Sequence, residues 1–274
     1  MNLRLTSLLA VLLVLAACSQ QQAPQPASAV AATAATTATP APIEAAPAAA
    51  ATSAAAPTAT PAAAQPEVPN NNPVVPPQGP LPVAGTDYEE IAGGQPYQPL
   101  DGRIEVVEVF GYVCPACASF HPVVSEWEKK LPADVHFTYV AAPFGPEWNP
   151  YAKSYYVAES MGLVSRTHDA LINAIHVQHT MPGEGDTPDE QKIADFYAGY
   201  GANPTQFLAA MNSFAVASKI ARGKQFMARS GVASTPTLVV NGKYRVTGGR
   251  GWQDKVRIAD HLIAMERAAA GNGG

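Results

Sequence analysis

Cysteine, basic residues and long apolar runs are all scarce in this sequence of 274 residues. Its three cysteines, Cys18, Cys114 and Cys117, are too few for a disulfide framework that would hold together a fold of this size. No Lys or Arg occurs between Arg4 and Arg103, and the formal net charge is −5, which argues against a nucleic-acid-binding face. No apolar run reaches the ~18 residues that a membrane-spanning helix needs.

The segment 21–70 lacks aromatic residues and contains only two charges, Glu44 and Glu67. Alanine and proline fill 31 of its 50 positions. Such a segment cannot bury enough side-chain surface to offset the conformational entropy that is lost on folding. We therefore predict a disordered linker over residues 19–86, acting as a tether, and a folded domain over residues 87–274 that is large enough for one core.

Residues 1–18 are typical of a bacterial export signal. Arg4 supplies a positive charge, and residues 8–17 form an unbroken apolar run directly before Cys18. This end of the run resembles the lipobox of bacterial lipoproteins, in which the cysteine becomes lipid-modified. An ordinary signal peptide with a chance cysteine is the alternative. The lipobox predicts a lipid anchor at Cys18 in the periplasm of a Gram-negative bacterium, and Ser19 favours the outer membrane.

The pattern of apolar residues over the remainder predicts an α/β fold. Residues 104–110 and 135–140 are typical of strands, and they flank a helix on which Phe120, Val124 and Trp127 share one face. A strand–helix–strand unit favours a parallel pair of strands. The other expected elements are a helical block over 150–212 with helix starts at Thr187-Pro188 and Asn203-Pro204, a helix over 215–230, a hairpin over 237–246 with a type I′ turn at Asn241-Gly242, and a helix over 252–268.

The motif Cys114-Pro115-Ala116-Cys117 lies between the first strand and the first helix. Pro115 suits the first helical position, which places Cys114 at the N-cap. The partial positive charge at a helix N-terminus stabilises a thiolate, the reactive form of cysteine. Cys114 is therefore the predicted nucleophile, and Cys117 is the predicted resolving thiol of an exchange through a mixed disulfide.

The two cysteines are also compatible with half of a zinc site. No second pair with this spacing occurs in the sequence. His121, four residues after Cys117, or the pair His176 and His179 would have to complete such a site. We favour redox chemistry, and we expect neither a metal nor a cofactor.

Residues 88–270 resemble the thioredoxin-like thiol:disulfide interchange proteins of the DsbA type. The resemblance is strongest in residues 106–117, in residues 212–214 with the helix after them, and in residues 235–244. It implies a thioredoxin fold with an inserted all-helical domain at about 146–212, which agrees with the order of the elements. It also implies that Pro236 is a cis-proline facing the cysteines and that Thr235 pairs its backbone with substrate. A trans proline at the start of a strand is the alternative.

Glu108 lies six residues before Cys114, where the family has a buried acid. A carboxylate in an apolar strand is costly unless it is neutral or paired. Burial would raise the pKa of Glu108 and make it a plausible proton acceptor for Cys117. An acid on an exposed strand face is the alternative.

Two positions depart from the best-known members of the family. Those members have a histidine between the cysteines, where this chain has Pro115 and Ala116. Ala116 cannot donate a side-chain hydrogen bond, so we expect a less acidic nucleophile and a less oxidising disulfide than in the members with histidine. Thr235 stands where valine is common in oxidases and where isomerase-type relatives have threonine, which leaves the direction of exchange open.

The sequence thus predicts an anchored periplasmic oxidase. It would pass its disulfide to exported proteins that are unfolded or still folding, and a membrane quinone-linked partner would reoxidise it. We expect a monomer that binds no nucleic acid. One alternative is a disulfide isomerase or reductase of the same fold, although such relatives usually carry a folded dimerisation module. Another is a non-catalytic anchored binding module, in which Cys114→Ser would leave function intact.

Overall fold

The computed structural model describes residues 70–271. The predicted signal segment, the predicted lipidation residue Cys18 and the predicted linker as far as residue 69 lie outside these residues. Within residues 70–271, no helix has both the length and the apolar character that crossing a membrane requires.

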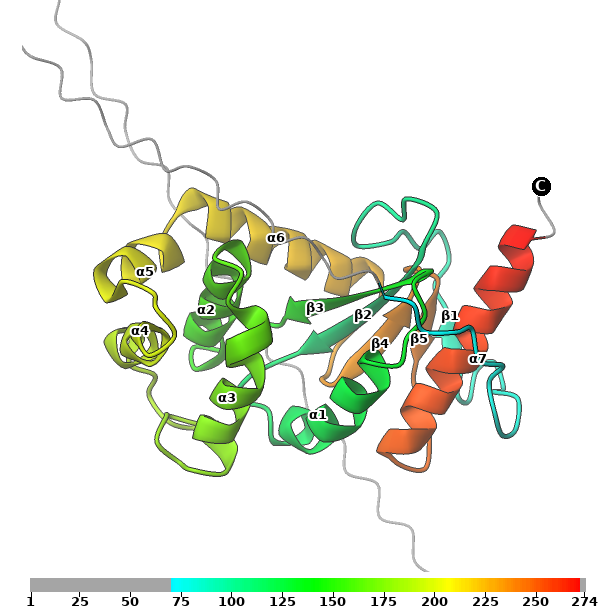
Figure 1. The fold of residues 1–274 in the computed structure, drawn as a ribbon, viewed down its shortest axis with the longest axis horizontal. Coiled ribbons are helices and arrows are strands. Elements are labelled where there is room, and N and C mark those ends of the chain that lie inside the picture. Colours follow the sequence, from blue (N-terminus) through cyan, green and yellow to red (C-terminus); the bar gives the residue numbers. More distant parts are fainter. Residues whose placement is uncertain (1–69, 272–274) are drawn as a thin grey trace, which may run out of the picture. The chain divides into compact units, whose positions relative to one another are not determined.

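Five strands form one mixed sheet in the order β1-β5-β4-β2-β3 (Figure 1). The interior strand β2 (Ile104–Phe110) pairs in parallel with β3 (Val135–Ala141) and antiparallel with β4 (Thr237–Val240). Strands β5 (Tyr244–Val246) and β1 (Tyr88–Glu90) continue the sheet antiparallel. The predicted parallel pair is confirmed. The sequence does not predict β1, because two of its three residues are charged and only pairing with β5 defines it as a strand.

Helices cover both faces of the sheet. Helices α1 (Pro115–Glu128) and α7 (Trp252–Gly271) pack on one face, and α6 (Phe214–Arg229) packs on the other, as Figure 1 shows. Because both faces are covered, all seven residues of β2 are buried. The core on the α1 and α7 face includes Val106, Phe120, Val124, Leu238, Ile258 and Leu262, and the core on the α6 face includes Val107, Val109, Phe226, Met227 and Val239.

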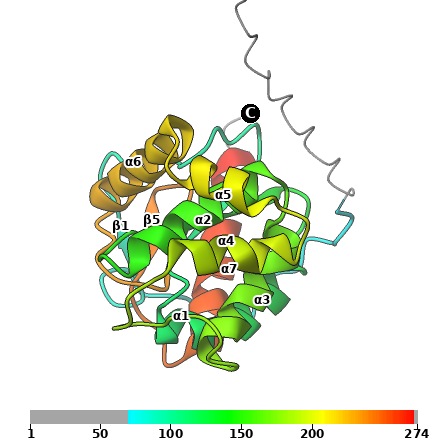
Figure 2. The ribbon, with the colours of Figure 1, turned by 90° about the vertical axis from the view of Figure 1, so that its left-hand side faces the viewer.

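Four helices between β3 and α6 form a block that faces the viewer in Figure 2, and their core extends to the end of β2 and the start of α1. They are α2 (Trp148–Ser160), α3 (Val164–His176), α4 (Glu190–Ala198) and α5 (Pro204–Met211). The predicted α/β fold with an inserted helical block is therefore confirmed.

Local signals in the sequence give most element ends correctly. Asn203 caps α5 by accepting the N–H of Gln206 at 3.0 Å, as predicted. Asn241 and Gly242 have φ of 49° and 64°, which confirms the type I′ turn. The start predicted at Thr187-Pro188 is wrong: α4 begins at Glu190, because the carboxylate of Asp189 caps it by accepting two backbone N–H groups.

Residues 70–83 lie against the domain, and we call this segment the N-terminal strap. Asn70 Nδ2 donates to the carbonyl oxygen of Leu131 at 2.6 Å, and Asn72 Nδ2 donates to that of Lys129 at 2.7 Å. Further along the strap, Arg257 on α7 donates to the carbonyl oxygen of Pro80. The described end of the predicted linker thus binds carbonyl groups at and just after the C-terminal end of α1. The extent of the linker itself stays a prediction.

Candidate active site

Cys114 lies between strand β2 and helix α1, directly before the first residue of α1. It is the N-cap of α1, with φ −76° and ψ 115°, and Pro115 occupies the first helical turn as predicted. The N–H of Cys117 donates to Cys114 Sγ at 3.3 Å. Both cysteines are free thiols, 6% and 3% exposed, so the structure shows the dithiol form.

The segment before β4 lies beside these thiols. Antiparallel pairing sets Thr237 opposite Val109, so the chain just before β4 runs past the end of β2. The Thr235–Pro236 peptide bond is cis, so the trans alternative is wrong. Thr235 Oγ1 donates to Cys114 Sγ at 3.3 Å, and the carbonyl oxygen of Thr235 lies 3.7 Å from the same sulfur. The sequence does not indicate this hydroxyl contact, because the two residues are 121 positions apart.

Hydrogen bonds lower the pKa of the Cys114 thiol to about 6. The Cys117 thiol contributes most, and the Thr235 hydroxyl and the backbone N–H groups of Cys117 and Ala116 add to it, while burial acts in the opposite direction. Ala116 therefore acts on the sulfur through its backbone alone. Cys114 is a thiolate at neutral pH and fits the predicted nucleophile.

The Cys117 thiol has the opposite character. Burial raises its pKa above the ordinary value, and its hydrogen bond to Cys114 and the charge on Cys114 raise it further. Cys117 consequently keeps its proton until a base takes it. The two thiols of one motif are therefore prepared for different steps of an exchange reaction.

Glu108 is buried beneath the cysteines, and the exposed-face alternative is wrong. The side chain is 2% exposed, and Glu108 Oε2 has no hydrogen-bond partner among the residues described. Burial raises its pKa well above the ordinary value, and the charges of Glu128 and Cys114 raise it further. A carboxyl group whose pKa is raised in this way binds a proton more readily, as a proton acceptor must.

Two of the three histidines considered as metal ligands, His121 and His176, are bonded elsewhere. His121 Nε2 lies 2.8 Å from Asp169 Oδ1, and His176 Nε2 lies 2.7 Å from the carbonyl oxygen of Tyr112. Between residues 70 and 271, no three His, Cys, Asp or Glu side chains are grouped so as to hold a metal ion. The hydrogen bonds that Cys114 Sγ accepts fit a cysteine that reacts as a thiolate.

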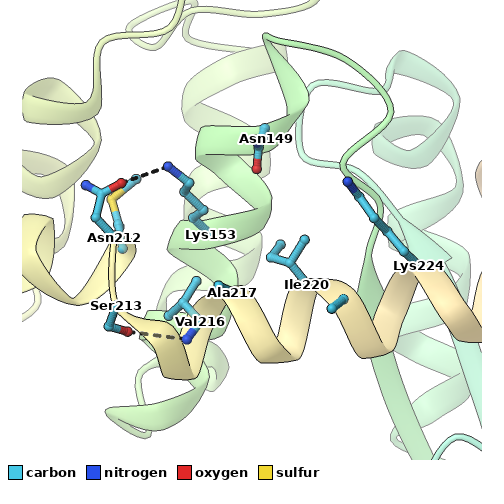
Figure 3. A pocket seen from close by; sticks show the side chains of 10 residues that line it. Asn149, Lys153, Asn212, Ser213, Val216, Ala217, Ile220 and Lys224 are labelled. Atoms are coloured by element: carbon cyan, nitrogen blue, oxygen red, sulfur yellow. Dashed lines mark hydrogen bonds between the residues drawn. The ribbon is translucent and has the colours of Figure 1, made fainter. Parts of the chain in front are cut away.

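A separate hollow of about 390 Å³ lies between α2 and α6 (Figure 3). Apolar side chains of α6, including Val216 and Ile220, line it together with Lys153 and Lys224. Lys153 Nζ donates to Asn212 Oδ1 at 2.9 Å. Neither cysteine lines this hollow, so it is not part of the thiol site.

Comparison with known proteins agrees with this geometry. The sequence model of the thioredoxin family matches residues 100–253. The thiol:disulfide interchange protein DsbA of Pseudomonas aeruginosa is 43% identical over 190 residues, which are 68% of this chain and 87% of that protein. DsbA of Pseudomonas syringae pv. tomato is 38% identical over 189 residues, which are 68% of this chain and 86% of that protein.

A solved structure gives the same result. The crystal structure of the oxidoreductase DsbA from Xylella fastidiosa superimposes with a TM-score of 0.65 at 42% identity, and the match covers 69% of this chain and 99% of that one. The fold, the thiol pair beside a cis-proline and these similarities lead to one conclusion. The chain belongs to the DsbA family of thiol:disulfide interchange proteins, and it is a thiol:disulfide oxidoreductase of that family.

Proposed function

We propose that this protein is an oxidase that introduces disulfides into exported proteins through the Cys114–Cys117 pair. The observation that carries the proposal is the set of hydrogen-bond donors directed at Cys114 Sγ. They stabilise its thiolate, and a stabilised thiolate is a good leaving group. Stabilising the reduced form makes the disulfide form oxidising.

The oxidising reaction proceeds in two exchanges. A substrate thiolate attacks Cys114 Sγ of the disulfide form, the Cys114–Cys117 bond breaks, and a mixed disulfide with substrate forms. Cys117 leaves as a thiolate and takes a proton from Glu108, because the pKa of the buried Cys117 thiol is raised. A second substrate thiolate then attacks the substrate sulfur, which forms the substrate disulfide and releases the Cys114 thiolate to its donors.

Reoxidation reverses these roles. The Cys114 thiolate attacks a disulfide of a membrane partner linked to quinones and forms a mixed disulfide with it. Cys117 gives its proton to Glu108 and attacks Cys114 Sγ, which restores the Cys114–Cys117 disulfide. The partner leaves with both electrons as a dithiol. Glu108 thus accepts a proton in one half of the cycle and donates it in the other.

Substrates bind beside the thiols through backbone pairing at Thr235 and Pro236. Ala233 and Ser234 before them are exposed, so an extended chain can reach this segment. Val177 offers substrates an apolar contact as well. It is 67% exposed and follows His176, whose ring contacts the carbonyl of Tyr112. These contacts impose little selection on substrate sequence.

The proposed place of action is the periplasm of a Gram-negative bacterium, with the domain attached to a membrane, the outer membrane being favoured, through lipid on Cys18. The lipobox-like end of the apolar run and the alanine- and proline-rich segment after it support this attachment. The Pseudomonas relatives, from Gram-negative bacteria, support the compartment. Mass spectrometry of the protein from membranes tests the lipid directly.

The redox potential of the full chain decides the direction of exchange. The protein is equilibrated in graded glutathione buffers, and the state of the Cys114–Cys117 pair is determined after alkylation. We expect a couple more oxidising than glutathione. A couple at or below the glutathione potential would contradict the oxidase and favour a reductase or isomerase.

The non-catalytic alternative has its own test. Reduced, unfolded ribonuclease is mixed with the oxidised full chain, and disulfide formation is followed by loss of free thiols. Cys114→Ser should abolish the reaction, with Ser119→Ala as a control on the exposed face of the same helix. Equal function of Cys114→Ser and the parent protein would favour a binding module.

A further inference from the structure

Glu128 and Tyr139 form a hydrogen-bonded pair near the buried Glu108. The Tyr139 hydroxyl donates to Glu128 Oε2 at 2.8 Å. Strands β2 and β3 align Glu108 with Tyr139, so their side chains leave the sheet on the same face. Glu128 is the last residue of α1, the helix that begins at the cysteines and covers this face. The pair therefore brings a second carboxyl group close to the first.

This pair has the access to solvent that Glu108 lacks. A groove of about 1010 Å³ is lined by Glu128 and Tyr139, together with residues of β3, α2 and α3. Both side chains are half-buried, whereas Glu108 is only 2% exposed and does not line the groove. Because Glu108 is buried, a proton on it can exchange with water through neighbouring groups, and Glu128 and Tyr139 line the groove.

The groups around Glu128 determine whether it can exchange protons. Burial raises its pKa and the charge of Asp169 raises it further, while the Tyr139 hydroxyl and Lys129 lower it. His168 stays neutral, because burial lowers its pKa to about 3. The titratable groups near Glu128 include Glu108 on β2, His136 and Tyr139 on β3, Tyr155 and Glu159 on α2, His168 and Asp169 on α3, and Lys129 beside it in sequence.

We propose that Glu128, held by Tyr139, is the positioning residue through which Glu108 exchanges its proton with solvent. The proposal rests on the proposed role of Glu108. During formation of the Cys114–Cys117 disulfide, the proton of the Cys117 thiol passes to Glu108 and then through the groove at Glu128 to water. The electron pair of the Cys117 thiolate forms the new S–S bond, and the thiol bound to Cys114 leaves with its own electron pair. In the oxidising direction the proton travels inward by the same route.

The resolving step can be observed by itself with Ellman's reagent. Reduced full chain with Cys18→Ser in every sample is mixed with the reagent in a stopped-flow instrument. Attack by Cys114 releases one thionitrobenzoate, and attack by Cys117 on the mixed disulfide releases the second. The rate of the second phase is measured from pH 5 to pH 9 for the parent and each variant.

Three variants distinguish the contributions of Glu108 and Glu128 to the rate of the second phase. Glu108→Gln should slow the second phase by about 100-fold, the lower end for loss of a general base. Glu128→Gln should slow it by about tenfold, because Glu108 must lose its own proton to water before it can accept that of Cys117, and this loss becomes slow. Tyr139→Phe should act in the same direction by about threefold, since Glu128 keeps its carboxyl group but loses the bond of about 1 kcal/mol that orients it. Glu126→Gln is the matched control, because Glu126 lies on the same helix but is exposed and pairs with Lys129.

Chemical rescue distinguishes proton exchange from a structural role. Formate is small enough for the groove, so it should restore the second phase of Glu128→Gln in proportion to its concentration while leaving Glu126→Gln unchanged. A slow Glu128→Gln that formate does not rescue would overturn the inference, as would a Glu128→Gln that is as fast as the parent. In either case a slow Glu108→Gln would leave the proposed function standing. An unaffected Glu108→Gln would instead remove the proposed role of Glu108 and this inference with it.

Discussion

Strand β2 buries two glutamates, Glu105 near its start and Glu108 near its middle, and they differ in their partners. Glu105 is 1% exposed, and its carboxylate accepts the N–H of Tyr97 at 2.7 Å and that of Gln98 at 2.8 Å. Glu108 is 2% exposed, and within residues 70–271 its Oε2 accepts no hydrogen bond. Residues of the same type, three positions apart in one strand, are thus held in two different ways.

This difference distinguishes the structural role of Glu105 from the proposed catalytic role of Glu108. Burial raises the pKa of both groups, but for Glu105 the two backbone N–H bonds act against burial and favour the charged form. Glu105 therefore fixes the loop at residues 97–98 to the sheet. Glu108 has no such bonds, and it lies near the cysteines, so its burial leaves it able to change protonation. Burial alone would not distinguish the two.

The largest expected effect is on stability at Glu105. Glu105→Gln removes the charge and turns an amide NH₂ toward a backbone donor, which should lower the free energy of unfolding by about 3 kcal/mol. Urea denaturation measures it, and Glu108→Gln is the matched control. Equal losses for the two variants would contradict the distinction between them.

A pH series sharpens the comparison at Glu108. Its pKa is raised in the folded state, so above the ordinary value of 4.5 the unfolded chain releases a proton that the folded chain retains. The folded state therefore loses stability as the pH rises from 4.5 through the folded pKa. Glu108→Gln removes this loss and should be more stable than the parent at pH 8 by about 2 kcal/mol, the scale for a buried polar group without a partner. The difference should vanish at pH 4, and a difference that is independent of pH would refute the assignment.

The third test concerns Cys114, whose sulfur accepts hydrogen bonds from its neighbours. Thr235→Val removes the hydroxyl that donates to Cys114 Sγ, and loss of a bond of about 1 kcal/mol should raise the thiol pKa by roughly 0.7. Thiolate absorbance at 240 nm across a pH titration measures it. The control is Thr237→Val, because the Thr237 hydroxyl donates to the carbonyl of Ser234 instead. An unchanged Cys114 pKa would mean that the hydroxyl does not stabilise the thiolate.

The smallest expected effect is at the N-terminal strap. Asn70→Ala removes the bond to the carbonyl of Leu131 and should lower the free energy of unfolding by about 0.5–1 kcal/mol. The neighbouring Asn71 provides the control, since its side chain makes no hydrogen bond in the part of the chain described. Equal denaturation midpoints for the two alanine variants would show that the strap does not stabilise the domain.

Local features made much of the fold and half of the site predictable. Cys114 and Cys117 are three positions apart at a helix start, so sequence spacing alone indicates their chemistry. The helical block and the hairpin turn likewise follow from neighbouring residues. The resemblance to the DsbA type supplied the cis bond at Pro236 and the buried position of Glu108.

The contacts that the sequence did not indicate join distant residues. The hydroxyl of Thr235 reaches Cys114 across 121 positions, and only the pairing of β2 with β4 brings them together. The hydrogen bond between Glu128 and Tyr139 depends in the same way on how α1 packs on β3. The predicted start of α4 at Thr187 was wrong because Asp189, two positions later, is the residue that caps the helix.

The N-terminal strap sets the point at which the predicted linker joins the domain. Asn70 is bound just beyond the C-terminal end of α1, whereas Cys114 caps its N-terminal end. The helix has 14 residues, so the two ends are about 21 Å apart. If the chain is held at Cys18 as proposed, the linker joins the domain at the end of α1 opposite the thiols. The attachment then leaves the thiol end of the domain free for substrates and for a redox partner.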